Sequence, residues 1–299
     1  MDTNAERAVR DAAMTWLDAR PPTTKVDYSY LASFEFHGTR IPLKDWSRGI
    51  RHPSGMEGAL SISTTFTPPG GTPPYDDLIG TDGLQRYNYR GTDPQHSENV
   101  ALRRAMELGL PVIWFVAVER GAYEPIYPVW VIGEEPALHR FVLAVDPAQR
   151  FLPTGDAAPV DVRSYALSLT KVRLHQRAFR ARVLLAYGGK CSICRLKHAE
   201  LLDAAHIIAD GQPNGQPVVP NGLSLCKIHH AAFDHKILGI RPDLSLHVRP
   251  DVLEEVDGWM LKGGIQEIHN KSLEIVPKSK AARPDPERLE ERYAEFLAG

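Results

Sequence analysis

Two pairs of residues in the second half of the chain have the spacing of metal ligands. Cys191 and Cys194 are separated by two residues, and so are Cys226 and His229. Zinc prefers four sulfur or nitrogen ligands arranged as a tetrahedron, and two such pairs can supply one complete set. The odd number of cysteines argues against a disulfide framework. The pattern therefore predicts a closed structural Zn2+ site, and the alternative is three reduced cysteines without a metal.

The segment from Leu201 to Asp234 combines these ligands with three short motifs. Its sequence, LLDAAHIIADGQPNGQPVVPNGLSLCKIHHAAFD, contains AHI, then NGL, then LCxxHHxxFD. In this order and spacing the segment resembles the zinc-supported form of the HNH, or ββα-metal, nuclease family. The resemblance implies a strand ending at His206, a loop containing Asn221 and a helix beginning near His230. It also implies a metal-dependent DNA endonuclease whose products carry 5'-phosphate and 3'-hydroxyl ends.

The polar residues of these motifs suit phosphodiester hydrolysis, which requires an activated water and a cation at the phosphate oxygens. His206 is the expected general base, because a neutral imidazole near pH 7 can accept a proton from water. His230 and Asp234 stand four residues apart on the expected helix, so they project from one face and can bind one Mg2+ or Mn2+ ion. Asn221 is expected to fix the backbone and the orientation of His206. The resemblance thus assigns catalysis to His206, Asn221 and His230.

One position departs from the common family pattern. Many members place an Asp or His immediately before the general base as a further metal ligand, and this chain has Ala205 there. The Ala-His-Ile version recurs in the subfamily that the chain most resembles, so activity is still expected. Asp203, which shares a strand face with Ala205, and His235 are alternative ligands.

A basic segment precedes the first cysteine pair. From Arg163 to Lys197 the chain has nine Lys or Arg residues and no acidic residue. The apolar spacing from Val172 to Tyr187 predicts a helix, which can hold DNA phosphates or simply face solvent. The residues expected to contact the DNA backbone are Lys171, Arg173, Arg177 and Arg180.

Residues 75–102 of the first half carry a second pattern, YDDLIGTDGLQRYNYRGTDPQHSENVAL. It combines an aromatic residue with paired acids, an aromatic strand ending in Tyr-x-Gly, and an Asn-x-Ala-Leu run that opens a helix. These features resemble the signature of the SRA (YDG) domain, a bent-sheet PUA-like fold that flips a modified cytosine out of duplex DNA. The family's glycine-rich stretch is shortened here to residues 91–94, and Arg90 replaces a small polar residue.

The residues of this pattern suit recognition of a flipped base, which needs stacking planes and a hydrogen-bonding partner. Tyr75 and Tyr89 are expected to sandwich the ring. Asp77 or Asp76 is expected to accept a hydrogen bond from the exocyclic amine of cytosine. Two alternatives stay open: the tyrosines belong to a strand core beside an acidic turn, or the domain recognises another altered feature of DNA.

Hydrophobic periodicity predicts the elements that position these residues. Residues 4–19 and 99–108 suit helices, and an apolar stripe in residues 285–297 predicts a C-terminal packing helix. The expected fold class is α+β, with an N-terminal bent-sheet or barrel PUA-like (SRA-like) domain at residues 1–150. A C-terminal ββα-metal HNH domain is expected at residues 160–299, with its core at 188–240. The expected strands are 61–66, 85–89, 112–118, 126–132 and 141–145.

Composition and charge bound the remaining choices. The 299 residues include 24% charged and 43% hydrophobic residues, which excludes a fully disordered, collagenous or coiled-coil chain. The net charge of −2 gives no attraction of the whole protein to a polyanion, so contact with DNA must be local. No apolar run reaches the roughly 20 residues that span a membrane, and the N-terminus lacks the layout of a signal peptide. We therefore expect a cytoplasmic protein that binds no membrane.

These patterns together predict a modification-dependent restriction endonuclease of an antiviral defence system, acting on double-stranded DNA. One HNH site cuts one strand, so a double-strand break requires two sites and is compatible with a homodimer. Two other functions remain as alternatives. One is a nickase or nuclease without modified-base specificity, acting on DNA or RNA, and the other is a non-catalytic, zinc-stabilised DNA-binding protein.

Overall fold

The computed structural model describes residues 1–20, 25–67, 79–152, 155 and 159–299. The chain divides into two compact units, Met1–Ala178 (unit 1) and Phe179–Gly299 (unit 2). The division falls within a helical run of α4 (Val160–Thr170), the π-helical η3 (Lys171–Gln176) and α5 (Arg177–Ala186). The sequence pattern predicts a boundary between residues 150 and 160 instead. The structure differs because residues of α4 and η3 pack against the core of unit 1.

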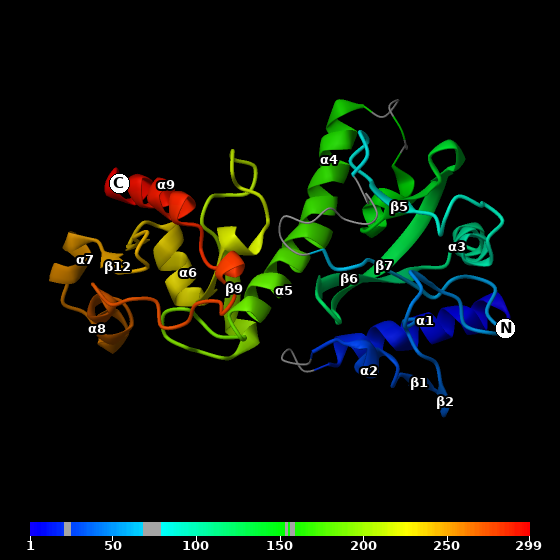
Figure 1. Ribbon diagram of the computed structural model, residues 1–299, viewed down its shortest axis with the longest axis horizontal. Coiled ribbons are helices and arrows are strands. Elements are labelled where there is room, and N and C mark those ends of the chain that lie inside the picture. Colours follow the sequence, from blue (N-terminus) through cyan, green and yellow to red (C-terminus); the bar gives the residue numbers. More distant parts are fainter. Residues whose placement is uncertain (21–24, 68–78, 153–154, 156–158) are drawn as a thin grey trace. The chain divides into compact units, whose positions relative to one another are not determined.

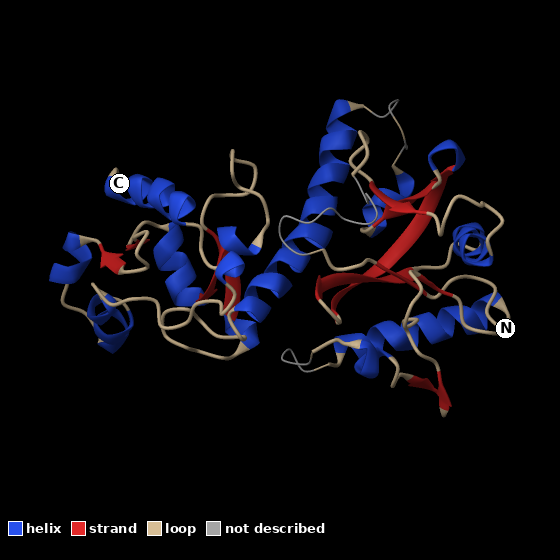
Figure 2. Ribbon diagram, in the orientation of Figure 1, coloured by secondary structure: helices blue, strands red, loops and turns tan. Residues whose placement is uncertain are grey.

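Unit 1 is built around a curled six-stranded sheet with the strand order β3-β4-β6-β7-β8-β5 (Figures 1 and 2). Neighbouring strands are antiparallel except β4 and β6, which are parallel. Register shifts occur in both ladders of the long β7, and such irregularities increase the bend of a strand. The strands are β3 (Ile50–Arg51), β4 (Ser61–Ser63), β5 (Gln85–Asn88), β6 (Val112–Glu119), β7 (Ala122–Glu135) and β8 (Arg140–Ala144).

Helices cover the two faces of this sheet. Along β6, Ile113 and Phe115 belong to one core with helix α1 (Thr3–Asp18), whereas Trp114 and Val116 belong to another core with helix α3 (Ser97–Glu107). This division follows from the alternation of side chains along a strand. Asp2 caps α1 by accepting a hydrogen bond from the Ala5 amide. The smaller elements of unit 1 are α2 (Tyr28–Leu31), β1 (Glu35–Phe36), β2 (Thr39–Arg40), η1 (Pro136–Leu138) and η2 (Pro147–Phe151).

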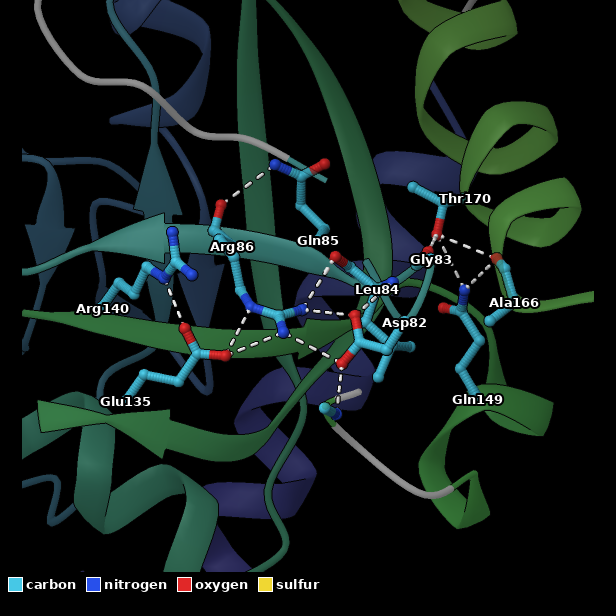
Figure 3. Close-up of polar contacts among 11 residues, drawn as sticks. Asp82, Gly83, Leu84, Gln85, Arg86, Glu135, Arg140, Gln149, Ala166 and Thr170 are labelled. Carbon is cyan, nitrogen blue, oxygen red and sulfur yellow. Dashed lines mark hydrogen bonds and ion pairs between the residues drawn. The ribbon is translucent and has the colours of Figure 1, made fainter. Parts of the chain in front are cut away.

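Two polar networks join α4 and the loop before β5 to this unit (Figure 3). The buried Arg86 guanidinium forms 2.9 Å bonds to both carboxylate oxygens of Asp82 and a 2.8 Å bond to Glu135. The Gln149 amide donates to the Thr170 hydroxyl at 2.8 Å, and that hydroxyl contacts the Gly83 carbonyl at 2.9 Å. Because these buried polar groups are paired, they stabilise the position of α4 on unit 1.

Unit 2 contains the elements of the ββα motif. The antiparallel pair β9 (Leu202–His206) and β10 (Gly222–Cys226) is followed directly by helix α6 (Lys227–Asp234); β9 and α6 are labelled in Figure 1. The C-terminal helix α9 (Pro286–Leu297) buries Leu289 and Phe296. A Cβ on Gly239 would lie 2.7 Å from the Phe296 ring, so only glycine permits this packing. The other elements are η4 (Ala199–Leu201), η5 (Val219–Asn221), β11 (Leu238–Ile240), β12 (Leu246–Val248), α7 (Pro250–Glu254), α8 (Trp259–Gly264), η6 (Gln266–Ile268) and η7 (Lys280–Ala282).

The structure confirms the α+β class and the helices and strands that periodicity predicts. It confirms β4, β5, β6, β7 and β8 within a few residues, and also α1, α3 and α9. Helix α4 was not predicted, because its apolar residues do not repeat as a clear stripe. In the described part of the chain, no helix has both the length and the apolar character needed to cross a membrane. The PUA-like assignment of unit 1 stays a prediction.

Candidate functional site

The β9–β10 hairpin places His206 at the end of its first strand, directly opposite Gly222. Gly222 has to be glycine, because a Cβ there would lie 2.4 Å from a methyl group of Val183 on α5. The Tyr187 hydroxyl donates to the Gly222 carbonyl at 3.1 Å. Helix α5 therefore packs closely against the end of the hairpin at which the predicted general base lies.

Asn221 is fully buried and holds the loop between the two strands. Its side-chain oxygen accepts from the Ile208 amide at 2.9 Å, and its amide nitrogen donates to the carbonyls of Ile208 and Gln216 at 2.9 and 3.1 Å. Its own backbone carbonyl accepts from the Ile207 amide at 2.9 Å. These bonds fix the backbone immediately after His206, which is consistent with the positioning role expected of Asn221.

The His206 imidazole stacks on Phe179 of α5, with ring centroids 4.0 Å apart and planes inclined by 21°. Its Nε2 is buried and has no hydrogen-bond partner among the described residues. Burial lowers the pKa of His206 below its usual 6.5, the charge of His230 lowers it further, and Asp210 and Asp234 act to raise it. Burial thus favours the neutral ring, whose Nε2 is left without a protein partner among the described residues.

His230 on α6 lies between two carboxylates. Its Nδ1 is 3.1 Å from Asp203 Oδ2, and its Nε2 is 3.3 Å from Asp234 Oδ2. Asp203 also accepts from Lys227 Nζ at 2.6 and 2.7 Å. Burial alone would raise the pKa of Asp203, but Lys227 and His230 outweigh burial and lower it. Carboxylate oxygens and an imidazole nitrogen are suitable donors for Mg2+ or Mn2+, so this cluster can hold a divalent cation.

The four predicted zinc ligands come together in the fold. The donor atoms of Cys191, Cys194, Cys226 and His229 all lie within 4.8 Å of one another. His229 Nδ1 is 3.5 Å from Cys191 Sγ and 3.2 Å from Cys226 Sγ, and the sulfurs of Cys194 and Cys226 are 3.9 Å apart. Tetrahedral zinc, with bonds of about 2.0–2.3 Å, spaces its ligand atoms about 3.5–3.8 Å apart. The cluster therefore fits a metal of that size and geometry.

The surroundings of the cluster favour metal binding. The hydrogen bond between Cys191 and Cys194 lowers the pKa of the Cys191 thiol and raises that of Cys194, so the cluster as it stands favours the thiolate at Cys191. His229 Nε2 lies 2.9 Å from the Gly264 carbonyl, so this nitrogen donates outward and Nδ1 faces the sulfurs. The Ser192 amide donates to the Ser224 carbonyl at 2.7 Å. The first cysteine pair is thereby attached to β10, next to the strand that carries the motif.

The three arginines predicted to contact DNA have protein partners. Arg173 Nε is 3.0 Å from Asp146 and Arg177 Nη2 is 3.2 Å from Glu124, within unit 1. In unit 2, Arg180 donates to the carbonyls of Ala199 and Leu202 at 2.7 and 2.9 Å. The Lys171 side chain is partly exposed at the start of η3. Contact of these four residues with DNA phosphates stays a prediction.

The predicted base-binding residues are only partly described. Tyr75, Asp76 and Asp77 lie outside the described residues. Tyr89 is 2% exposed, its ring centroid is 4.8 Å from that of Phe141, and its hydroxyl donates to Glu134. Its ring is therefore held within the core of unit 1, and its role as a stacking plane stays a prediction.

Unit 1 contains a cavity of about 440 Å³, a volume typical of small-molecule sites. Its walls come from segments within residues 44–50, 63–66, 87–90 and 117–123, together with Glu98 of α3. Tyr89 is one of the lining residues, as are the exposed Trp46, Arg48 and Arg90. The cavity thus brings aromatic rings, a carboxylate and exposed cations together around one space.

Comparison with known proteins identifies one part of the chain. Residues 191–241 match the family model described as HNH endonuclease, so this segment is an HNH endonuclease domain. A solved structure described as "Modification dependent TagI restriction endonuclease" is similar over 84% of this chain and 86% of that chain, with 18% sequence identity and a TM-score of 0.30. The comparison with curated proteins found no match.

The sequence motifs indicate no role for Phe179 or Glu98 and only an alternative role for Asp203, although the structure places all three at these sites. Phe179 and His206 stack although 27 positions separate them in the chain, so no local motif connects them. Asp203 was only an alternative metal ligand, and its contact with His230 depends on how α6 packs against β9. Glu98 directly precedes the helix predicted at residues 99–108, and only the tertiary fold brings it to the cavity wall.

Proposed function

We propose that this chain is a metal-dependent endonuclease that cleaves double-stranded DNA carrying a modified base. The HNH endonuclease domain at residues 191–241 supports the nuclease activity. The observation that carries the proposal is the arrangement of the motif histidines: His206 has a buried nitrogen without a partner among the described residues, and His230 lies between Asp203 and Asp234.

In the proposed reaction, His206 accepts a proton from the water that attacks phosphorus. Phe179 holds the plane of the imidazole, and burial keeps the ring unprotonated at neutral pH. Asn221 holds the loop after β9, which limits movement of His206 during the proton transfer.

His230 and Asp234 are the residues proposed to hold a Mg2+ or Mn2+ ion, with Asp203 orienting His230 through Nδ1. The bound cation would stabilise negative charge on the phosphate and on the leaving oxygen. Asp203 and Ala205 lie two residues apart on the same face of β9. Ala205 cannot bind a metal, and the negative charge of Asp203 partly replaces the Asp or His ligand that many family members have at that position. The products are expected to have 5'-phosphate and 3'-hydroxyl ends.

Cys191, Cys194, Cys226 and His229 are proposed to bind a structural zinc ion. Such an ion would join the turn that carries Cys191 and Cys194 to the end of β10 and to α6, in addition to the apolar core that the hairpin shares with the rest of unit 2. Lys171, Arg173, Arg177 and Arg180 are proposed to contact the DNA backbone, for which the three arginines must exchange or share their present partners.

The restriction to modified DNA is proposed for unit 1. The SRA-like pattern of residues 75–102 and the cavity in the same unit support it. Tyr75, Asp76, Asp77 and Tyr89 are the proposed base-binding residues from the sequence pattern. Because one HNH site cuts one strand, we propose that two copies act together on a duplex.

The test of nuclease activity compares the protein with a His206→Ala variant on supercoiled plasmid containing 5-methylcytosine. We expect cleavage with Mg2+ or Mn2+, none when the divalent cation is omitted from zinc-loaded protein, and a loss of about 10²–10⁴-fold in rate for His206→Ala. His198→Ala, which changes an exposed histidine of the same unit, is the matched control and should cut normally. Cleavage by His206→Ala at the rate of the control would overturn the assignment of the base.

A further inference from the structure

The C-terminal helix α9 lies outside the HNH segment of residues 191–241, yet two of its arginines contact that segment. Arg288 and Arg292 are four residues apart, so they project from the same face of α9. Arg288 contacts the loop after β9, and Arg292 contacts α6. These are the two halves of the proposed nuclease site: residues 206–221 contain the general base and its loop (the base half), and α6 carries the proposed metal ligands (the metal half).

Arg288 holds the loop of the base half through Gln216. Its Nη2 donates to the Gln216 side-chain oxygen at 3.0 Å, and the Gln216 carbonyl accepts from the Asn221 side-chain amide at 3.1 Å. The amide of Asp285, the N-cap residue of α9, donates to the Pro220 carbonyl at 3.0 Å. Asn221 in turn fixes the backbone that follows the general base. The start of α9 thus limits movement of the loop on which the position of that base depends.

Arg292 holds the last turn of α6. Its Nη2 donates to the Phe233 carbonyl at 3.0 Å, and its guanidinium lies 4.9 Å from the centre of the buried Phe233 ring. The last carbonyls of a helix have no partner within the helix, and a cation there can bond them and interact favourably with the helix dipole. Phe233 directly precedes the proposed metal ligand Asp234. Arg292 therefore fixes the end of the short helix from which Asp234 and His230 project.

Helix α9 is attached to unit 2 by contacts other than these two arginines. Leu289 is fully buried in the apolar core of unit 2, and Phe296 is also buried. The Tyr293 hydroxyl accepts from Arg241 Nε at 3.1 Å and lies 2.7 Å from His247 Nδ1. Because these contacts do not depend on the arginines, substituting either arginine should leave α9 in place.

We propose that α9 sets the position of the general base relative to the metal-binding residues, with Arg288 as the positioning residue of the base half and Arg292 as that of the metal half. The proposal rests on the proposed function, because it assigns positioning roles within the same nuclease site. Hydrolysis requires the attacking water and the cation to meet at one phosphate, and a displacement of about 1 Å can reduce the rate about 100-fold. Since the arginines contact different halves, their losses should differ in kind.

The test measures two quantities on the full, zinc-loaded chain. One is Mn2+ binding without DNA, followed by the EPR signal of free Mn2+ and counted only where His230→Ala abolishes it. The other is the rate of cleavage of plasmid containing 5-methylcytosine at increasing Mn2+ concentration. Each variant is first checked for zinc content and thermal unfolding.

Arg292→Met keeps the apolar stem of the side chain but removes its charge and its donors. We expect the Mn2+ dissociation constant and the Mn2+ concentration for half-maximal cleavage to rise about tenfold, because the metal ligands are less well placed. The rate at saturating Mn2+ should fall by less than about threefold, since excess cation restores occupancy of the site. Arg292→Lys can still donate to the Phe233 carbonyl and should recover most of the affinity.

Arg288→Met should act in the opposite way. We expect the rate at saturating Mn2+ to fall about tenfold while the Mn2+ dissociation constant stays within about twofold, because the base half alone is released. Gln216→Ala removes the acceptor of Arg288 from an exposed loop residue, so the fold should persist even where Arg288→Met disturbs it. It should lower the rate by a similar factor. The double variant should be no slower than either single variant, because both remove the same interaction.

Arg283→Met is the matched control, since Arg283 also donates to a backbone carbonyl of unit 2, that of Pro277. It should match the unaltered protein in both quantities. Folded Arg288→Met and Arg292→Met proteins that match this control would overturn the proposal and leave the nuclease standing. Equal losses of rate and of Mn2+ affinity in both variants would also overturn it, because general loosening of unit 2 predicts that result.

The two measurements also separate this proposal from the proposed function. If the unaltered protein binds Mn2+ but cuts no DNA, the nuclease and the role of Arg288 are both overturned. The role of Arg292 is then decided by Mn2+ binding alone, which should still weaken about tenfold in Arg292→Met and stay unchanged in Arg283→Met.

Discussion

The two candidate sites differ in how their residues are distributed along the chain. In unit 2, the motif histidines, the buried asparagine and the cysteine cluster all lie within residues 191–241, on the turn that carries Cys191 and Cys194, the hairpin after it and the helix that follows. In unit 1, the cavity gathers residues from four separate segments and from α3. A site formed by one continuous supersecondary unit leaves a motif with fixed spacing in the sequence, whereas a cavity formed by tertiary packing does not.

The two units also differ in what stabilises them. Unit 1 has a six-stranded sheet with apolar cores on its two faces. Unit 2 also has an apolar core, which includes Leu202 and Leu223 of the two-stranded hairpin, but the attachment of the hairpin to the preceding turn includes the Cys191, Cys194, Cys226 and His229 cluster. We therefore expect removal of a metal ligand to affect unit 2 far more than unit 1.

The largest effect is expected for Cys226→Ser. A structural zinc site contributes about 10 kcal/mol or more to the folding of small domains, so loss of one thiolate should release the metal and unfold unit 2. Zinc content by atomic emission and limited proteolysis with mass spectrometry should show residues 179–299 degraded while residues 1–178 survive. Joint loss of both units would contradict the difference in stabilisation, and a variant that keeps stoichiometric zinc would contradict the ligand assignment.

Asp203→Asn should have the next largest effect, because it removes the charged acceptor at His230 Nδ1. Residues that orient a metal ligand typically contribute 10–100-fold to activity or metal affinity, and the cleavage rate should fall by about that factor. The Mg2+ or Mn2+ concentration for half-maximal cleavage should rise. Lys227→Gln removes the other partner of Asp203 but keeps the His230 contact, and it should cut within about threefold of the unaltered protein.

Phe179→Leu should lower the cleavage rate about tenfold, because the imidazole of His206 loses the ring that sets its plane. It should also change the pH profile. Burial lowers the pKa of His206, and cleavage requires the neutral ring, so activity is lost as pH falls through that pKa. A smaller side chain admits water and raises the pKa, which should move the acidic limb to higher pH. Phe296→Leu, a change on α9, should leave that limb in place.

The smallest effects are expected for Lys171→Gln and Arg173→Gln. If each residue contacts one phosphate, each substitution should reduce the slope of log binding constant against log salt concentration by about 0.9. Binding isotherms at several salt concentrations measure this slope. Lys262→Gln, on α8 of unit 2, is the control and should leave it unchanged. If Arg173→Gln leaves the slope unchanged, Arg173 of the unaltered protein makes no phosphate contact and keeps its ion pair with Asp146.

These differences explain what could be predicted from the sequence. The HNH segment, the metal ligand pairs, and the strands β6, β7 and β8 could be predicted because each leaves a local pattern of spacing or apolar runs. The end of unit 1 could not be predicted, because α4 is held in place by buried contacts between segments distant in the sequence. One example is the hydrogen bond from Gln149 to Thr170. Glu98 could not be assigned to the cavity for the same reason.

Residues that position a catalytic or metal-binding side chain could not be predicted from the sequence for the same reason. Asp203 and His230 come together only when α6 packs beside β9, and the stacking of Phe179 on His206 requires α5 to lie against the hairpin. The sequence indicates that a histidine is present at the right place in a motif. The pKa and orientation of that histidine depend on neighbours that the motif does not contain.

The central claim is that unit 2 cuts DNA and unit 1 restricts the cutting to modified DNA. The most direct test is cleavage of matched unmodified, 5-methylcytosine and 5-hydroxymethylcytosine duplexes with Mg2+ or Mn2+, beside the His206→Ala protein. We expect cleavage of at least one modified duplex, intact unmodified duplex, and no cleavage by His206→Ala. Equal cleavage of all three duplexes would contradict the role of unit 1, and no cleavage of any duplex with either cation would contradict the nuclease itself.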